Sequence, residues 1–237
     1  MGLMYWQIGD IWQAPTSSTV EYELKWKMGH YYVQHMYKPV YPIVILTPYL
    51  ANITDENARL QMYINSELVN GTHGELIWSL VPLDTFDTKL SISLNYSLTS
   101  ADTILLADYP YATLMNRANC SASNQCVLHC RSSSNNSQEE IGQTVFLTQP
   151  KNYQLQQPNL RIENITHISS TEINFRVTGT RPALFVWLDI SANMSGYFSQ
   201  NGFHMFEPTK SITFYSWTPI TGDFDLSITS LFDVTEP

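Results

Sequence analysis

Two residues near the start of the chain, Trp6 and Asp10, are of types that contact sugars. Trp6 ends a short apolar run, residues 2–6, that is typical of a buried strand, and Asp10 lies in the loop that follows. Enzymes built as α/β barrels assemble their active sites where such strands end. There an indole ring can stack on a sugar, and a carboxylate can position a hydroxyl group or a neighbouring side chain. The alternative is structural, with Trp6 closing the end of a barrel and Asp10 holding the loop.

The acidic side chains do not form a catalytic pair. Hydrolysis of a glycosidic bond normally requires two carboxylates on either side of the bond, and in a barrel these come from different strands. The pattern here supplies only one strand of that type. Glu21 and Glu23 fall at the expected start of a helix, where the helix dipole favours acidic residues. The sequence also lacks G-x-S-x-G, H-E-x-x-H, P-loop and G-x-G-x-x-G motifs. We therefore predict no catalytic residue in this stretch.

Three cysteines lie close together, and their odd number leaves one unpaired. We predict a disulfide across a short loop such as Cys120–Cys126, with Cys130 free. The alternative is a metal site at Cys126, His129 and Cys130, but this group offers only three ligands and no second pair follows. The six histidines are scattered without ligand spacing, and we expect His30 to be a hydrogen-bonded core residue. We expect neither a metal nor another cofactor.

The overall composition excludes some classes of partner. The 237 residues carry a net charge of −9, and only 14% of them are charged. Binding to a phosphate backbone requires clustered Lys and Arg, so we expect no nucleic-acid partner. No run of about 18 apolar residues is present, so we expect no membrane-spanning segment.

The chain is rich in acceptor sites for N-linked glycans. The number of these sites indicates passage through the secretory pathway, where glycans are attached at surface loops. Residues 1–10, however, lack the basic start, apolar core and cleavage site of a signal peptide, so we expect that the natural protein begins further upstream. The seven Asn-x-Ser/Thr sequons are at Asn52, Asn70, Asn95, Asn119, Asn135, Asn164 and Asn193.

The first forty residues differ from the rest of the chain. Tyr22, Trp26, His30, Val33 and Tyr37 recur every three or four positions, which predicts one face of an amphipathic helix. Ser18 or Thr19 would cap this helix at its start, and Pro39 and Pro42 would end it. A strand, a loop and a helix cannot bury their own apolar faces, so residues 1–40 are predicted to belong to a larger α/β layer.

After Tyr41 the pattern predicts a mainly β protein. Alternating apolar residues indicate strands, most clearly over residues 90–98, while the Ser-, Asn- and Gln-rich residues 121–140 favour a long surface loop. Residues 150–158 are typical of a linker. Five further strand candidates, with Trp187 expected in the core, fit an immunoglobulin-like sandwich. The predicted domains are residues 1–40, 41–157 and 158–237, the last two being sandwiches.

Motifs at both ends of the chain resemble one enzyme family. Residues 5–15 (YWQIGDIWQAP), 21–22 (EY) and 25–32 (KWKMGHYY) resemble the end of the catalytic barrel of animal lysosomal β-mannosidases, which belong to glycoside hydrolase family two. Residues 185–189 (FVWLD), 198–205 (FSQNGFHM) and 212–217 (ITFYSW) resemble the closing immunoglobulin-like domain of the same family. The similarity is weaker across residues 45–155, where the cysteine-bearing loop is consistent with a cysteine pair in the family's penultimate domain.

The resemblance implies that residues 1–40 are the last strand and helix of a (β/α)8 barrel, followed by two immunoglobulin-like sandwiches. It further implies a lysosomal, retaining hydrolase that removes terminal β-D-mannose from N-glycan core oligosaccharides. In the family both catalytic glutamates lie on earlier barrel strands, so this chain alone should be inactive. Trp6 matches the family tryptophan that borders the mannose subsite.

The sequence departs from the family pattern beside this subsite. Gly9 replaces an asparagine, Ser17 replaces a tryptophan, and Glu23-Leu24 replaces a glycine-rich pair. These changes leave open whether the whole enzyme, of which this chain would be the C-terminal part, is active. The alternative function is that of a stand-alone module that binds carbohydrate or a partner through exposed aromatic side chains.

Overall fold

The computed structural model describes residues 4–191 and 194–235. It contains two compact units, Lys38–Gln156 and Met1–Tyr37 together with Gln157–Pro237. The described part of the chain contains no helix long and apolar enough to cross a membrane.

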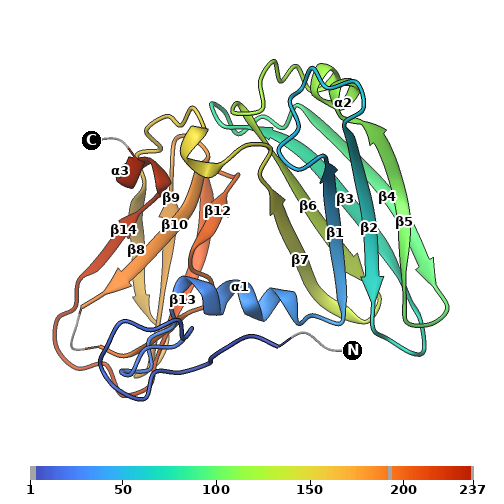
Figure 1. Ribbon diagram of the computed structural model, residues 1–237. Coiled ribbons are helices and arrows are strands. Elements are labelled where there is room, and N and C mark those ends of the chain that lie inside the picture. The colour runs from blue at the N-terminus through green and yellow to red at the C-terminus, as the bar shows by residue number, and fades with distance from the viewer. Residues whose placement is uncertain (1–3, 192–193, 236–237) are drawn as a thin grey trace. The chain divides into compact units, whose positions relative to one another are not determined.

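The unit Lys38–Gln156 is a sandwich of two antiparallel sheets, which we call the first sandwich. Apolar side chains that alternate along each strand meet between the sheets, around the fully buried Trp78. Strand β4 pairs with β3 and therefore belongs to a four-stranded sheet, and the other sheet has three strands. Figure 1 shows how the strands of this unit are arranged. One sheet comprises β1 (Val40–Thr47), β2 (Arg59–Ser66) and β5 (Asp102–Pro110); the other comprises β4 (Leu90–Leu98), β3 (Thr72–Pro82), β6 (Cys126–Ser134) and β7 (Ser137–Val145).

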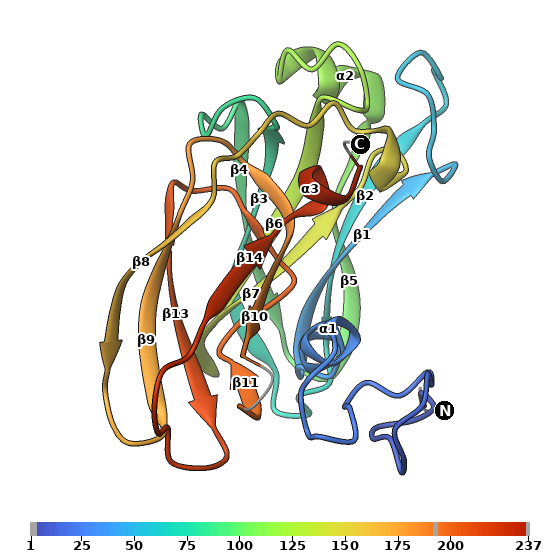
Figure 2. The ribbon, with the colours of Figure 1, turned by 90° about the vertical axis from the view of Figure 1, so that its left-hand side faces the viewer.

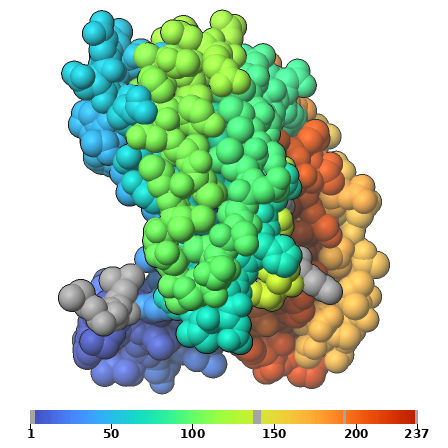
Figure 3. Space-filling view, turned by 90° about the vertical axis from the view of Figure 1, so that its right-hand side faces the viewer, coloured from blue at the N-terminus to red at the C-terminus, as the bar shows by residue number. Residues whose placement is uncertain are grey.

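Two short helices complete the first sandwich. Helix α2 (Tyr111–Arg117) buries Leu114 and Met115 in the core, and a 3-10 helix, Pro150–Asn152, precedes the buried Tyr153. Strands β4 and β5 contribute to the surface seen in Figure 3.

Residues 157–237 form a second two-sheet sandwich, which we call the C-terminal sandwich (Figure 2). Its core contains Phe175, Val186 and Phe214, drawn from both sheets, and helix α3 (Leu231–Thr235) follows the last strand. One sheet has the order β11 (Gly196–Phe198), β13 (Thr209–Ser216), β9 (Glu172–Thr178), β8 (Arg161–His167); the other has the order β12 (Phe203–Met205), β10 (Ala183–Ile190), β14 (Leu226–Thr229).

The helix near the start of the chain is shorter than its sequence pattern predicts. Helix α1 (Met28–Met36) begins six residues after Tyr22, and neither Ser18 nor Thr19 caps it, since Lys27 occupies the cap position. The chain turns back before the helix, where Val20 bridges to Trp26. Of the predicted strand, residues 1–3 lie outside the described residues and residues 4–6 form no strand.

Two further expectations are wrong. Residues 121–140 are not a long loop, because most of them belong to the hairpin of β6 and β7. The inward side chains of β6, Cys126, Leu128 and Cys130, belong to the core between the sheets and hold this polar hairpin in the sandwich. Trp187 lies on the face of β10 opposite the buried Val186 and Leu188, and its ring contacts Tyr31 of α1 instead.

Candidate functional site

The loop after Trp6 folds back on itself. The amide of Asp10 donates to the carbonyl of Val20 at 3.0 Å, and the amide of Val20 donates to the carbonyl of Ile8 at 2.8 Å. Thr19 adds a side-chain bond to the carbonyl of Ile8 at 3.2 Å. The resulting parallel bridge between Gly9 and Val20 brings residues 8–10 beside residues 18–20, and we call residues 8–20 the Asp10 loop.

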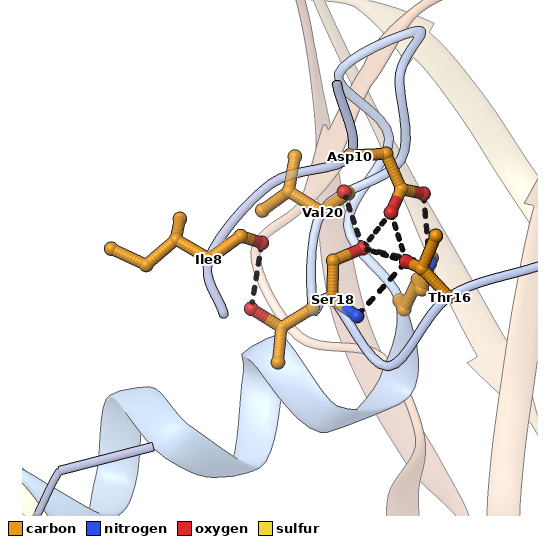
Figure 4. A network of polar contacts seen from close by, with 7 residues as sticks. Ile8, Asp10, Thr16, Ser18 and Val20 are labelled. Atoms are coloured by element: carbon orange, nitrogen blue, oxygen red, sulfur yellow. Dashed lines mark hydrogen bonds and ion pairs between the residues drawn. The ribbon is translucent and has the colours of Figure 1, made fainter. Parts of the chain in front are cut away.

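The carboxylate of Asp10 is the centre of a polar network (Figure 4). Its Oδ1 accepts hydrogen bonds from the hydroxyls of Thr16 and Ser18, and its Oδ2 accepts from Lys27 Nζ at 3.0 Å. Lys27 also donates to Ser18 Oγ at 3.0 Å. The side chain of Asp10 is only 6% exposed, so the network ties the Asp10 loop to the residue that precedes α1.

These contacts stabilise the ionised form of Asp10. The hydrogen bonds from Ser18 and Thr16, followed by the contact with Lys27, lower the pKa of Asp10 to about 2. Asp10 therefore stays charged at any physiological pH, and its oxygens are already occupied by donors. This arrangement suits an anchor for the loop and does not suit a proton donor.

Trp6 lies outside this network, and its side chain is 82% exposed. Asp10 therefore anchors the loop through these contacts, whereas the indole of Trp6 is exposed on the surface. Other apolar side chains nearby in sequence share this exposure: Met4, Ile8, Ile11 and Trp12. Such a run of exposed apolar residues is unusual for a free surface and indicates an interaction site.

An open hollow of about 350 Å³ borders the network. Gln13 donates a hydrogen bond to the carboxylate of Glu23 across it, and the ring of Tyr22 is 52% exposed at its side. Most of the residues that line it are polar; the lining comprises Asp10, Gln13, Ala14, Pro15, Glu21, Tyr22, Glu23 and Lys27. Glu21 and Glu23 thus lie ahead of α1 and not in its first turn.

The alternative of a metal site at Cys126, His129 and Cys130 is not supported, because Cys126 lies in a disulfide. The structure contains a Cys120–Cys126 disulfide, while Cys130 is free and buried. His129 instead contacts Thr144 Oγ1 at 3.1 Å. Among the described residues no group of three His, Cys, Asp or Glu side chains is placed to hold a metal ion. His30 is half-buried and bonds to Thr19 Oγ1 at 2.9 Å, and burial lowers its pKa.

The sequon asparagines that the structure describes are all exposed. Asn193 lies outside the described residues. These exposed asparagines are Asn52, Asn70, Asn95, Asn119, Asn135 and Asn164, and their glycosylation stays a prediction.

The partners of Asp10 could not be inferred from the sequence. Lys27 is 17 positions away, and Ser18 resembled a helix cap. Ser18 is a polar residue that is only 4% exposed, a property that the sequence does not reveal.

Comparison with known proteins places this geometry in context. An Ig-fold domain model of mannosidases matches residues 155–234. The chain is 30% identical to the β-mannosidase of Bos taurus over 240 residues, which is 98% of this chain and 26% of the relative. The chain matches the C-terminal portion of the β-mannosidases. It is also 29% identical to β-mannosidase A of Aspergillus clavatus, over 86% of this chain and 22% of that protein.

Solved structures agree at the level of the fold. The β-D-mannosidase of Dictyoglomus thermophilum superposes with a TM-score of 0.63 at 14% identity, over 94% of this chain and 25% of that one. An exo-chitosanase of Amycolatopsis orientalis gives a TM-score of 0.63 at 13% identity, over 97% of this chain and 30% of its own. The sequence similarity to the β-mannosidases confirms the family resemblance that the motifs carry. The chain spans about a quarter of the length of the curated relatives that it matches.

Proposed function

We propose that this chain is the C-terminal part of a β-mannosidase that removes terminal, non-reducing β-D-mannose residues from N-glycan core oligosaccharides with retention of configuration. The observation that carries the proposal is the similarity to β-mannosidases along 98% of the chain. The general acid/base and the nucleophile, both glutamates, would lie on barrel strands outside this stretch. The chain alone would then be inactive.

Residues 1–40 would complete the catalytic barrel in the whole enzyme. The exposed apolar side chains of Met4, Ile8 and Ile11 support this role, because they would be covered by neighbouring barrel elements. Trp6 would border the mannose subsite with its free indole. Asp10 would not contact the substrate itself but would hold the loop that follows Trp6.

The lysosome, reached through the secretory pathway, is the proposed location. The six exposed sequons support passage through that pathway. The Cys120–Cys126 disulfide supports an oxidising compartment during folding.

A chromogenic β-mannoside assay tests the proposal on two proteins, the 237-residue chain and the product of the complete reading frame. We expect turnover only by the longer protein, with loss of affinity for substrate in its Trp6→Ala variant. Turnover by the 237-residue chain, or none by either protein, would contradict the proposal.

The exposed rings of Trp6 and Trp12 also favour a second candidate, a non-catalytic carbohydrate-binding module. Titration of the 237-residue chain with mannose oligosaccharides tests it. Binding that is lost in Trp12→Ala, together with an inactive longer protein, would support the module.

A further inference from the structure

A tight turn joins the Asp10 loop to helix α1. In this turn the amide of Glu21 donates to the carbonyl of Lys25 at 2.8 Å, and the amide of Leu24 donates to the carbonyl of Glu21 at 2.9 Å. Leu24 has a φ of 64°, a left-handed conformation that residues with a Cβ rarely adopt. Surrounding contacts must therefore hold this turn, which we call the Leu24 turn (residues 21–25).

The C-terminal sandwich supplies those contacts. Trp217 Nε1 donates to the carbonyl of Leu24 at 3.1 Å, and the hydroxyl of Ser195 donates to the carbonyl of Glu23. The carbonyls of Glu23 and Leu24 thus accept hydrogen bonds from side chains that lie 172 and 193 positions away in the sequence.

An aromatic stack fixes the residue that follows the turn. The ring of Trp26 stacks on that of Tyr197 with centroids 4.3 Å apart and an interplanar angle of 14°. Tyr197 in turn contacts the rings of Tyr215 and Trp217, each with centroids 5.1 Å away. Trp217, which donates a hydrogen bond to the carbonyl of Leu24, therefore belongs to the same aromatic cluster that contacts Trp26.

The other side of the Leu24 turn leads to the Asp10 loop. The carboxylate of Glu23 accepts a hydrogen bond from Gln13, which lies within that loop. Lys27, next to Trp26, binds both Asp10 and Ser18. A continuous set of contacts thus runs from the sandwich, through residues 23–27, to the carboxylate of Asp10.

We propose that Trp217 and Ser195 are positioning residues, which hold the Leu24 turn and through it fix the conformation of the Asp10 loop. The consequence for a mannoside substrate rests on the proposed function, whereas the coupling of loop and sandwich does not. The C-terminal sandwich would then influence substrate affinity without contacting substrate.

Amide hydrogen exchange of the 237-residue chain tests the coupling. The variant Trp217→Phe keeps an aromatic ring but removes the N–H donor, and Ser195→Ala removes the second donor. We expect each variant to speed exchange at the amides of Asp10 and Val20 by about fivefold, the effect of losing one net hydrogen bond. Bacterial periplasmic expression avoids glycans, which matters because Ser195 also completes the Asn193 sequon.

A second readout is the pKa of Asp10, followed by the NMR shift of its carboxyl carbon. We expect this pKa to rise from about 2 toward the ordinary value in both variants, because a looser loop weakens the bonds from Ser18 and Thr16. A general loss of stability would not produce this change.

The matched control is Phe224→Leu, which weakens the core of the C-terminal sandwich at a residue that contacts His167. We expect it to leave the exchange of the Asp10 loop unchanged. Unchanged exchange in Trp217→Phe and Ser195→Ala, or an equal increase in Phe224→Leu, overturns the coupling. Because no readout involves a mannoside, an inactive longer protein would refute the proposed function and leave the coupling intact.

Discussion

The hydroxyl oxygen of Tyr31 accepts a hydrogen bond from the backbone amide of Phe198 at 3.0 Å, across 167 positions of sequence. Tyr31 and Phe198 are each only 5% exposed, so no water replaces the bond. Burial raises the pKa of Tyr31 to about 12, which keeps the hydroxyl protonated. The bond joins α1 to strand β11 within the unit that contains the C-terminal sandwich.

We expect Tyr31→Phe to lower the free energy of unfolding by about 1–2 kcal/mol, because the amide of Phe198 would remain buried without an acceptor. Urea denaturation measures the change. The matched control is Tyr49→Phe, at a side chain that is 82% exposed and should show no effect. Equal stability of Tyr31→Phe and the parent chain would show that the bond is not formed in solution.

Replacement of Leu24 by glycine should stabilise the chain. The left-handed φ of 64° strains Leu24, and its side chain is 57% exposed, so little burial would be lost. Glycine adopts this conformation without the penalty of about 1–2 kcal/mol, though it adds entropy to the unfolded chain. We expect a net gain of about 0.5–1 kcal/mol in urea denaturation.

The variant Leu24→Ala provides the control for this prediction, since it keeps a Cβ and therefore keeps the strain. We expect its stability to stay close to that of the parent. A gain with alanine as large as that with glycine would mean that strain at Leu24 is not the cause.

The stability of the chain should depend on Asp10 at low pH. The folded pKa of Asp10, about 2, lies below the ordinary value of about 4, so the folded state holds the charged form more strongly. This contribution is complete above pH 4 and is lost as the pH falls toward 2. In Asp10→Asn we expect lower stability at neutral pH and a smaller loss between pH 4 and 2.

Urea denaturation at several pH values between 2 and 7 follows this effect, with exposed Asp223→Asn as the control variant. The Asp10→Asn curve should converge on the parent curve at low pH. If the two curves stay parallel down to pH 2, Asp10 is not held as a charged anchor.

The strands were predictable wherever apolar residues alternate regularly. Leu60, Met62 and Ile64 appear in β2 as fully buried side chains, because strict alternation determines which face of a strand is inward. The hairpin of β6 and β7 was missed for the opposite reason. Its turn and outer face are rich in Ser and Asn, as loops are. Residues 126–134 form a strand because they pair with the neighbouring strand β3.

Tertiary contacts also explain the error in the first helix. Tyr22 and Trp26 have helical spacing, but Trp26 is held by Tyr197 from a distant strand and the chain turns at Leu24. For the candidate site, residue type and position led to Asp10 and Trp6, and the contact of Trp6 with a sugar stays a prediction. The Lys27 contact of Asp10 could not be predicted, because it depends on a turn whose stability comes from Trp217.

The free thiol of Cys130 should be unreactive in the native chain. Cys130 is fully buried, and burial raises the pKa of its thiol to about 12, so almost no thiolate forms at pH 8. We expect a thiol reagent to label Cys130 only after unfolding, while Cys120 and Cys126 stay protected by their disulfide until reduction. Mass spectrometry of the labelled peptide checks the position. Labelling of Cys130 in the native chain would contradict its burial, and a label on Cys126 before reduction would contradict the Cys120–Cys126 pairing.

Asn135 should combine a glycan with a structural role. Its Oδ1 accepts hydrogen bonds from Thr72 Oγ1 at 3.1 Å and from the amide of His73 at 3.0 Å, while the residue is exposed and a glycan would be attached at its Nδ2. In a secretory host we expect Asn135→Gln to lose one glycan and about 1 kcal/mol of stability, because Thr72 is buried and loses its acceptor. Asn95→Gln, at an exposed position of β4, should lose only the glycan.

Gel mobility before and after enzymatic deglycosylation measures the glycans of these two variants, and urea denaturation of the deglycosylated proteins measures their stability. Equal stability of Asn135→Gln and Asn95→Gln would show that the side chain of Asn135 does not hold the hairpin turn between β6 and β7. An unchanged mobility shift in both variants would show that neither asparagine is glycosylated, which would also weaken the proposed route through the secretory pathway.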